Sequence, residues 1–293
     1  MIDSLAASPT ETNSPSIARI CSVLGVSRSG YYAHRNKPHG LRRQQDQQLG
    51  TIIGSCFRDS CHTYGTPRLR ADLRSLGHGV GRRRIARLMR EQGLCPRQKR
   101  RFVPMTTDSR HGRPTAPHRL LGQPAPDAAG QVWVSDITFV PTGEGWLYLA
   151  AEMDLFSRRI VGWDARGDME RGLVLQALEN AVAVSQGRLR GLIHHSDQGT
   201  QYASHDFVTA LERLGIEASM SRRGNCYDNA AMESFWATLK TECFSGEIPA
   251  TRAQGRSMIF DYIHGFYNPR RRHSSLGYLS PDDYERSHSR ALF

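Results

Sequence analysis

Residues 131–163, QVWVSDITFVPTGEGWLYLAAEMDLFSRRIVGW, decide the fold of this chain. The stretch holds three apolar runs, at 131–140, 146–153 and 159–163, which are separated by short connections. The first run alternates apolar and polar positions, as a half-buried strand does. Three strands joined in this way predict a meander. Asp136 lies in the middle of the first strand, where a charge is costly unless it has a partner such as a metal ion.

Helices and strands alternate after this meander. A segment rich in Leu and Ala predicts a helix over about 169–185, and a short buried strand is expected over 189–194. A second helix over about 203–214 leads to a strand over 216–220, and a third helix covers about 229–243. Three strands followed by alternating helices and strands predict a mixed α/β sheet.

Three carboxylates stand out against this order. Asp136 interrupts an apolar strand, and Asp197 follows a later strand, at the end where α/β sheets place their sites. Glu233 lies on the predicted helix 229–243. Converging carboxylates bind Mg²⁺ through hard oxygen ligands, and a pair of such ions supports phosphodiester chemistry. We therefore predict that these three residues are catalytic and bind metal.

Positive charge is concentrated in the first part of the chain. The 293 residues carry a net charge of +11, but residues 1–125 hold 22 of the 39 Lys and Arg and 7 of the 28 Asp and Glu. Residues 126–293 are therefore slightly acidic. A genome rich in Arg codons would explain the preference for Arg over Lys, but not this asymmetry. The split suggests polyanion binding by the first part and carboxylate chemistry in the second.

The basic part is predicted to consist of short helices. Ser14-Pro15 predicts a helix start, Gly25 predicts its end, and a second helix is expected from Ser27. This order is typical of a helix-turn-helix. The pattern of a helix closed by glycine recurs over 66–77 and 80–93.

Arginines gather on one face of the helix predicted within 80–93. We expect this face to contact DNA phosphates, and a solvated surface is the alternative. The residues expected to bind DNA in this helix are Arg82, Arg83, Arg84, Arg87 and Arg90. The same role is expected, on weaker grounds, for Arg28, Arg222, Arg223, Arg270, Arg271, Arg272 and Lys240. For the cluster at 270–272 the alternative is a helix end favoured by the dipole.

Four segments follow from these patterns. A helix-turn-helix-like segment is expected over 1–38 and a second helical DNA-binding unit over 39–95. A linker is expected over 96–128, since residues 96–126 hold six of the 14 prolines and the basic run RQKRR. The catalytic core with a helical extension is expected over 129–293.

The spacing of the carboxylates is similar to that of a known superfamily. Asp197 and Glu233 are separated by 35 residues, and Lys240 follows Glu233 by seven residues. Seven residues are nearly two helical turns, so these last two residues share one helix face. The chain resembles the transposases and integrases that carry a DDE triad on a ribonuclease-H-like core. The resemblance implies that Lys240 meets a DNA phosphate beside the metals.

Longer segments narrow the resemblance to the downstream-frame protein (OrfB) of the third family of bacterial insertion sequences. The resemblance covers about residues 16–285. Its most specific segments are VWVSDITFVPTGEGWLYLAAEMDLFSRRIVGW, LIHHSDQGTQY, SRRGNCYDNAAMESFWATLKTE and YNPRRRHSSLGYLSP, with LGVSRSGYY and YGTPRLRADLR before them. The implied fold is a ribonuclease-H-like mixed α/β sheet, the integrase catalytic core, preceded by a small all-α helix-turn-helix region.

The resemblance implies a DNA transposase that nicks at an element end and then uses the freed 3′-hydroxyl to attack another phosphodiester. Asp136, Asp197 and Glu233 would hold two Mg²⁺ or Mn²⁺ ions. The implied partners are double-stranded DNA (terminal inverted repeats and target), further copies of this chain on DNA, and an upstream-frame (OrfA) partner. The chain shows no heptad run and is expected to be the downstream product alone. A repressor that binds the ends without cutting, and a structure-selective nuclease, are the competing functions.

Several nearby residues have more ordinary interpretations. We expect Asp154 to hold a turn or to pair with Arg158 or Arg159. Asp228 is expected to cap the helix that carries Glu233, because Asp favours N-caps. His194 and His195 are expected to pack at a strand end, with proton transfer or DNA contact as the alternative. Trp236 is expected in the core.

Other classes of protein are excluded or disfavoured. No apolar run approaches the roughly 20 residues of a membrane span, and the N-terminus lacks the pattern of a secretory signal. Six cysteines are too few for a disulfide scaffold, so a reduced intracellular setting is expected. The resemblance implies that this setting is the bacterial cytoplasm, near the nucleoid. Cys56, Cys61 and His62 resemble metal ligands but lack a second matching pair.

Overall fold

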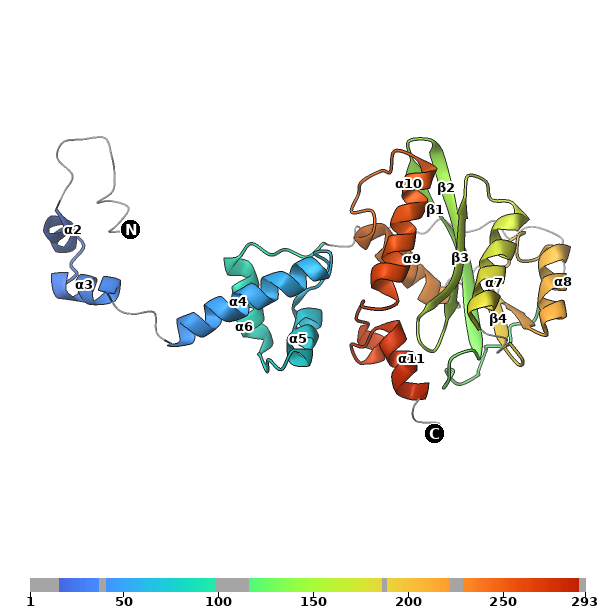
Figure 1. Cartoon of the computed structure of the whole chain (residues 1–293), viewed down its shortest axis with the longest axis horizontal. Helices are drawn as coiled ribbons and strands as arrows, with labels where there is room; N and C mark the ends of the chain where they lie inside the picture. The colour runs from blue at the N-terminus through green and yellow to red at the C-terminus, as the bar shows by residue number, and fades with distance from the viewer. Residues whose placement is uncertain (1–15, 37–40, 98–115, 186–188, 222–228, 290–293) are drawn as a thin grey trace. The chain divides into compact units, whose positions relative to one another are not determined.

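The computed structural model describes residues 16–36, 41–97, 116–185, 189–221 and 229–289. The chain divides into two compact units, Met1–Gly54 and Ser55–Phe293. Figure 1 shows the helices and strands of each. Ser14-Pro15, Arg222, Arg223 and Asp228, which were given roles above, lie outside the described residues.

Two short helices lie in the first unit, where the sequence predicts a helix-turn-helix-like segment. Helix α2 spans Ile17–Val23 and α3 spans Arg28–Asn36. The N-cap of α2 is Ser16, two residues later than the predicted Ser14, and its hydroxyl accepts a hydrogen bond from the Arg19 backbone N–H. Gly25 has a φ of +64° between the helices, a conformation that glycine adopts without strain.

A long helix that the sequence interpretation missed follows these two. Helix α4 spans Leu41–Asp59. Its buried apolar side chains, Leu49, Ile53, Cys56 and Phe57, recur every three or four residues, so the helical period is present. The polar run RRQQDQQ before them hides that period at the start of the helix.

The two glycine-closed helices are confirmed in the second unit. Helix α5 spans Thr66–Ser75 and α6 spans Arg82–Glu91. Each has an apolar side that is fully or nearly fully buried, with Leu69 and Leu73 on α5 and with Ile85, Leu88 and Met89 on α6. The arginine-rich face of α6 therefore points away from this core.

The predicted meander and mixed sheet are also confirmed. The five strands have the order β3-β2-β1-β4-β5. The first three are antiparallel neighbours, whereas β4 is parallel to β1 and β5 is parallel to β4. The strands are β1 (Val132–Thr142), β2 (Gly145–Asp154), β3 (Ile160–Arg166), β4 (Ile193–Ser196) and β5 (Glu217–Met220). This is the sheet expected of a ribonuclease-H-like core.

The strand predicted over 189–194 is shifted by several residues. Residues 189–192 form a turn, in which the Leu192 backbone N–H donates to the Leu189 carbonyl, and the strand starts at Ile193. Gly191 has a φ of +80°, which is incompatible with an extended strand. The apolar run therefore contains a turn and only the beginning of β4.

Helices cover both faces of the sheet. Helices α7 (Arg171–Ser185) and α8 (His205–Leu214) lie on one face, and α9 (Ala230–Glu242) and α10 (Arg252–Phe260) lie on the other (Figure 1). At Gly162 on β3 an added Cβ would lie 2.3 Å from the Ala177 carbonyl oxygen of α7. Only glycine permits this close approach of helix and sheet.

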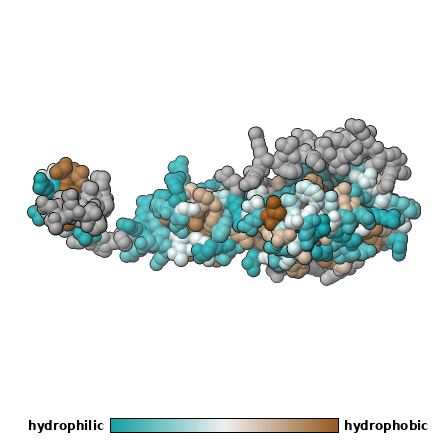
Figure 2. Space-filling model, turned by 90° about the horizontal axis from the view of Figure 1, so that it is seen from above, coloured by the Kyte–Doolittle hydropathy of each residue, from teal (hydrophilic) through white to brown (hydrophobic). Residues whose placement is uncertain are grey.

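Large apolar side chains form a buried core on the sheet. The core on the α7 side includes Trp133, Leu173, Leu178 and Phe207, each 2% exposed or less. Figure 2 shows apolar residues on one face of the molecule only as scattered patches among hydrophilic ones. None of the helices within the described residues is long and apolar enough to cross a membrane.

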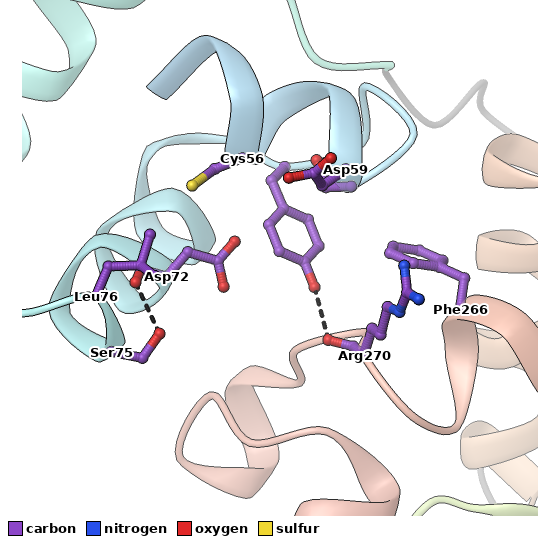
Figure 3. A pocket seen from close by; sticks show the side chains of 9 residues that line it. Cys56, Asp59, Asp72, Ser75, Leu76, Phe266 and Arg270 are labelled. Atoms are coloured by element: carbon purple, nitrogen blue, oxygen red, sulfur yellow. Dashed lines mark hydrogen bonds between the residues drawn. The ribbon is translucent and has the colours of Figure 1, made fainter. Parts of the chain in front are cut away.

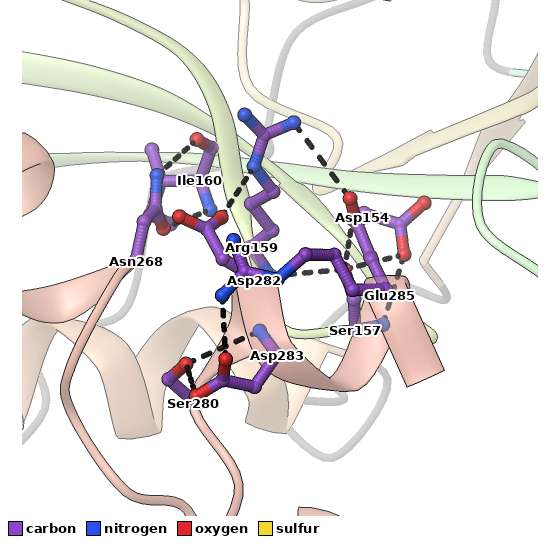
Figure 4. A network of polar contacts seen from close by, with 10 residues as sticks. Asp154, Ser157, Arg159, Ile160, Asn268, Ser280, Asp282, Asp283 and Glu285 are labelled. Atoms are coloured by element: carbon purple, nitrogen blue, oxygen red, sulfur yellow. Dashed lines mark hydrogen bonds and ion pairs between the residues drawn. The ribbon is translucent and has the colours of Figure 1, made fainter. Parts of the chain in front are cut away.

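The C-terminal extension packs against the sheet. It continues α10 with a π-helical turn, Asp261–Tyr267, and ends in α11, Pro281–Ser289. Figure 4 shows the polar network between this extension and the β2–β3 turn. Asp154 accepts hydrogen bonds from the Gly130 and Ser157 backbone N–H groups, so it holds the turn as expected.

Arg159 differs from the expected pairing with Asp154. Its Nε donates to Asp282 Oδ1 at 3.0 Å, and its Nη1 lies 3.8 Å from Glu285 Oε2. The backbone of Ile160 is paired at both its N–H and its carbonyl by the Asn268 side chain. The extension is thereby fixed to the sheet by charged and amide groups.

Residues 116–131 contain no helix or strand, yet they are not a free tether. The Arg119 backbone N–H donates to Ser219 Oγ at 3.0 Å, and its guanidinium lies 3.0 Å from Glu217 Oε2. Both partners belong to β5. The described end of the expected linker therefore lies against the edge strand of the sheet.

Candidate active site

The sheet places Asp136 on β1 level with Asp197, the first residue after the neighbouring strand β4. Strands β1 and β4 pair in parallel with Val132 opposite Ile193 and Val134 opposite His195. Two residues further, this register aligns Asp136 with Asp197. Strand β4 ends at Ser196, whereas β1 continues to Thr142. Asp136 and Asp197 therefore lie at the point where β1 is no longer paired with β4.

Asp136 is strongly perturbed. Burial and, next, the nearby charge of Asp197 raise its pKa to about 7, and Glu233 adds a smaller effect in the same direction. Two hydrogen bonds oppose this rise: Trp236 Nε1 donates to Oδ2 at 2.9 Å, and the Ile137 backbone N–H donates to Oδ1 at 2.8 Å. A cluster of like charges that raises a carboxyl pKa is typical of a functional site.

Asp197 begins the loop after β4. Its Oδ1 accepts a hydrogen bond from the Gly199 backbone N–H at 2.9 Å, which fixes the side chain in the tight turn SDQG. The side chain is partly exposed. Its place directly after β4 is the position predicted from the sequence.

Helix α9 lies against β1 and brings a stripe of side chains to this edge. The Asn229 side chain, at the start of the helix, donates to the Ser135 carbonyl at 3.0 Å. Glu233 is exposed, Trp236 is buried and Lys240 is partly buried, and the three are spaced at helical intervals. Glu233 and Lys240 thus share the face that the spacing predicts.

Trp236 has a second role beside the core position expected for it. It is 6% exposed, but its indole N–H is used by Asp136. The sequence carries a signal for this contact, because Trp236 is one turn after Glu233 on the same face. Aromatic residues at that spacing are usually core residues, so the polar contact could not be distinguished.

Lys240 lies over an aromatic ring at the open edge of β1. Its Nζ is 5.2 Å from the centre of the Phe139 ring, a cation–π distance. Burial lowers the pKa of Lys240, and the charge of Asp136 partly offsets this effect. Phe139 in turn contacts Trp146 edge-on, with ring centres 4.9 Å apart.

A buried polar network lies behind Asp136. His194 Nε2 is 2.9 Å from Glu152 Oε2, and Ser135 Oγ contacts both Glu152 and the Tyr202 hydroxyl. His195 contacts Ser219 and is likewise buried. Both histidines are therefore packed at the strand end, as expected. The inward direction of Ser135 and Glu152 was not predicted.

The residues expected to bind DNA separate into two groups. Arg82, Arg83 and Arg90 are exposed on α6, and Arg28 is exposed on α3. Arg84 and Arg87 are partly buried, and Arg87 pairs with Glu91 at 2.8 Å.

The cluster at 270–272 requires a correction. Arg271 is 3% exposed and forms two 2.7 Å hydrogen bonds to Glu242, so its guanidinium cannot reach DNA. Arg272 pairs with Asp72 and donates to the Tyr278 carbonyl. Only Arg270 is exposed. The sequence shows the charge of these residues but not their partners, which are remote in sequence: Glu242 for Arg271 and Asp72 for Arg272.

Within the described residues, no group of three His, Cys, Asp or Glu side chains is placed to hold a metal ion. This applies to Cys56, Cys61 and His62, of which Cys56 is buried while Cys61 is exposed. It applies equally to the three acidic candidates, which are neighbours at one edge but are not gathered around a common point.

Family models match most of the described chain. A model described as "Integrase core domain" matches residues 126–226, a second model of that description matches 214–281, and an "HTH-like domain" matches 44–102. The fold is accordingly that of the ribonuclease-H-like integrase core with a helical DNA-binding region before it.

Solved structures give a weaker likeness. An intasome of simian T-cell lymphotropic virus has a TM-score of 0.46 at 16% identity, over 76% of this chain and 70% of that chain. The catalytic core domain of HTLV-2 integrase, solved in complex with magnesium, has a TM-score of 0.42 at 13% identity. That alignment covers 54% of this chain and 98% of that chain.

Curated relatives are similar over almost their whole length. A 31 kDa protein of insertion element IS600 from Shigella sonnei is 47% identical over 89% of this chain and 96% of its own. The transposase InsF of insertion sequence IS3A from Escherichia coli (strain K12) is 39% identical over 92% of this chain and 94% of its own. An integrase core domain, a helix-turn-helix-like domain and this similarity over almost the whole chain show that it belongs to the IS3-family insertion-sequence transposases.

Proposed function

We propose that this transposase cuts DNA at the ends of its element and joins the freed ends to target DNA, with Asp136, Asp197 and Glu233 as metal ligands. The single observation that carries the proposal is the register of β1 and β4, which puts Asp136 level with Asp197 directly after the end of β4. The charge of Asp197 raises the pKa of Asp136, which supports the proposal because a bound divalent cation would offset this repulsion.

The residues fit a divalent metal in kind. All three candidates offer carboxylate oxygens, which suit Mg²⁺ and Mn²⁺. Asp136 and Asp197 form the core of the site, whereas Glu233 acts on Asp136 more weakly than Asp197 does. We therefore expect α9 to move Glu233 inward when metal and DNA bind. When bound, two such ions would polarise the phosphodiester and stabilise the attacking and leaving oxygens.

The reaction has two transfers at phosphorus. Water first attacks the phosphodiester at an element end, the bond from phosphorus to the 3′-oxygen breaks, and a 3′-hydroxyl is released. That hydroxyl then attacks a second phosphodiester, forms a new ester bond and displaces another 3′-oxygen. No covalent link between protein and DNA is needed.

Residues of this chain orient the site and the DNA. The N–H groups of Trp236 and Ile137 each occupy one oxygen of Asp136, which fixes the plane of its carboxylate. Lys240 is proposed to contact a phosphate beside that carboxylate. The exposed arginines of α6 and Arg28 are proposed to hold the DNA backbone, since such contacts position a protein without reading bases.

We propose two protein partners, namely further copies of this chain and an upstream-frame protein. Synapsis of two element ends requires more than one protomer, so we propose an oligomer of this chain on DNA. We also propose an upstream-frame partner that would supply a multimerisation segment. Sedimentation of the protein with and without a duplex carrying one terminal repeat distinguishes these arrangements.

The proposed function is tested by incubating the protein with a labelled duplex that carries the element's terminal inverted repeat. We expect nicks at the repeat boundary and joined products in Mg²⁺ or Mn²⁺, and neither product in EDTA. A protein that only occupies the ends would bind this duplex equally well and cut in no condition. Cutting that ignores the repeat and follows DNA structure would instead indicate a structure-selective nuclease.

Replacement of Lys240 by Gln tests the proposed phosphate contact. Because one phosphate contact is lost among many, affinity should fall only a few-fold, and the slope of log K against log salt should decrease by about 1. Cleavage should fall by about 10-fold or more, since the contact lies beside Asp136. Lys240→Arg keeps the charge and is the control. An unchanged salt slope and rate in Lys240→Gln would remove Lys240 from the DNA interface.

A further inference from the structure

Glu242 lies at the end of α9, two residues after Lys240, and both oxygens of its carboxylate accept hydrogen bonds from side chains of the protein. Its side chain is 7% exposed. Arg271 donates through Nε to Oε2 and through Nη2 to Oε1, each at 2.7 Å, and the Tyr262 hydroxyl donates to Oε2 at 2.9 Å. The helix that carries Glu233 is thereby fixed to the C-terminal extension.

The helical part of the same unit reaches the same residue. Arg68 on α5 has its Nη1 3.9 Å from Glu242 Oε1, and its Nε donates to the Arg272 carbonyl at 2.9 Å. Arg97, after α6, donates to the Glu242 backbone carbonyl at 2.9 Å. Three arginines from three segments of the chain therefore converge on one residue of the catalytic helix.

A second set of contacts lies beside this point. The Tyr64 hydroxyl donates to the Arg270 carbonyl and accepts from the Arg272 backbone N–H, and its ring contacts Phe266 (Figure 3). Arg272 also pairs with Asp72 on α5. The segment 270–272 is thus a polar strap between the helical part and the core.

The strap lies beside an open pocket. This pocket, of about 220 Å³, lies between α4, α5 and the extension, and it is lined by residues that include Asp59, Tyr64, Asp72, Phe266 and Arg270 (Figure 3). Directional hydrogen bonds and ion pairs join the helical part to the core next to it, and such contacts fix orientation as well as distance.

We propose that Arg68 and Tyr64 are positioning residues, which act through Glu242 and the strap 270–272 to hold α9 at a set place relative to α5 and to the proposed DNA-contacting helix α6. The inference rests on the proposed function. DNA held by α6 would then present one particular phosphodiester to Glu233 and Lys240. The sequence suggested the strap as a DNA contact. In this proposal it instead sets the distance between the DNA contacts of α6 and the carboxylates that cleave the phosphodiester.

Replacement of Arg68 by Met tests this role. It removes both the charge beside Glu242 and the hydrogen bond to the Arg272 carbonyl. We expect affinity for the terminal-repeat duplex within about threefold of wild type, at least a 10-fold loss of cleavage at the correct phosphodiester, and cuts spread over neighbouring positions. Arg68→Lys, which keeps the charge, should restore part of the accuracy. A residue that only stabilises the fold would lower activity without moving the cut.

Arg74→Met is the matched control. Arg74 lies on the same helix, is exposed and loses the same charge, so any general weakening of DNA binding appears in both variants. Tyr64→Phe is the milder second variant, because it removes two hydrogen bonds at the junction and keeps the ring contact with Phe266. It should also spread the cuts, whereas Tyr148→Phe in the sheet should not.

The outcomes separate the inference from the proposed function. If the wild type makes no metal-dependent cut, the proposed function fails. If the wild type cuts and both Arg68→Met and Tyr64→Phe cut at the same phosphodiester as the wild type, the positioning role is wrong while the function stands. Thermal unfolding of each variant shows whether it is folded, and Tyr64→Phe remains decisive should Arg68→Met unfold.

Discussion

Arg271→Met will lower the free energy of unfolding by about 3–5 kcal/mol, the cost of removing one partner from a buried ion pair. Arg271 is 3% exposed, and both oxygens of Glu242 depend on its guanidinium. Without it, Glu242 stays buried with a hydrogen bond from Tyr262 and the more distant charge of Arg68. Urea denaturation monitored by circular dichroism measures the difference.

The neighbouring residue provides the control. Arg270 carries the same charge but is exposed, so Arg270→Met should change the free energy of unfolding by no more than about 0.5 kcal/mol. The double variant Arg271→Met with Glu242→Met should recover much of the loss, because replacing both members of a buried pair by apolar groups is often close to neutral. Equal stabilities of Arg271→Met and Arg270→Met would show that the pair does not hold the extension.

The contrast between these two arginines shows why charge clusters are hard to interpret from sequence. Arg270, Arg271 and Arg272 are consecutive, and their charge alone suggests a phosphate contact. The three side chains point in different directions, and the middle one, Arg271, forms a buried ion pair with Glu242. Burial of a charge depends on a partner that is remote in sequence, so the local pattern cannot reveal it.

The sheet was predictable because its signals are local. The meander of β1 to β3 follows from three apolar runs with short connections, and α5 and α6 follow from apolar spacing closed by glycines. The long helix α4 was missed because its first half is polar. Strand β4 was displaced because Gly191 places a turn inside an apolar run.

The sequence proposes the members of the candidate site but not their arrangement. Asp136 is selected as a charge within an apolar strand, and Asp197 and Glu233 are selected by their spacing; the effect of Asp197 on the pKa of Asp136 supports these two as neighbours. The contact from Trp236 depends on how α9 rotates against β1. That rotation is set by packing and by the Asn229 hydrogen bond, neither of which leaves a pattern in the sequence.

Asp136→Asn should abolish cleavage, a loss of at least about 10³-fold or roughly 4 kcal/mol in the barrier. The amide has nearly the same shape but lacks the negative charge that a divalent cation requires. Binding to the terminal-repeat duplex should stay within a few-fold of wild type, because the phosphate contacts lie on other elements. Glu212→Gln, an exposed carboxylate on α8, is the control and should cut normally.

The same variant should change how stability depends on pH. The pKa of Asp136 is raised from 3.8 to about 7, so the folded protein holds this proton more tightly than the unfolded chain does. The resulting stabilisation is fully present below about pH 4 and is lost as the pH rises through 7. Asn does not ionise and has no such loss. The Tm of Asp136→Asn should therefore rise relative to wild type between pH 5 and pH 8 in EDTA.

Metal should reverse this difference. In the wild type at pH 8, Mg²⁺ or Mn²⁺ would neutralise the repulsion between Asp136 and Asp197 and raise the Tm, since a ligand that binds only the folded state stabilises it. The Asp136→Asn protein should show a much smaller rise, and Glu212→Gln should respond as the wild type does. Equal metal-induced shifts in wild type and Asp136→Asn would place the metal elsewhere, even if the variant had lost cleavage. Repulsion between Asp136 and Asp197 lowers the stability of the metal-free protein, because the positive charge that would balance these carboxylates is supplied only by a bound metal ion.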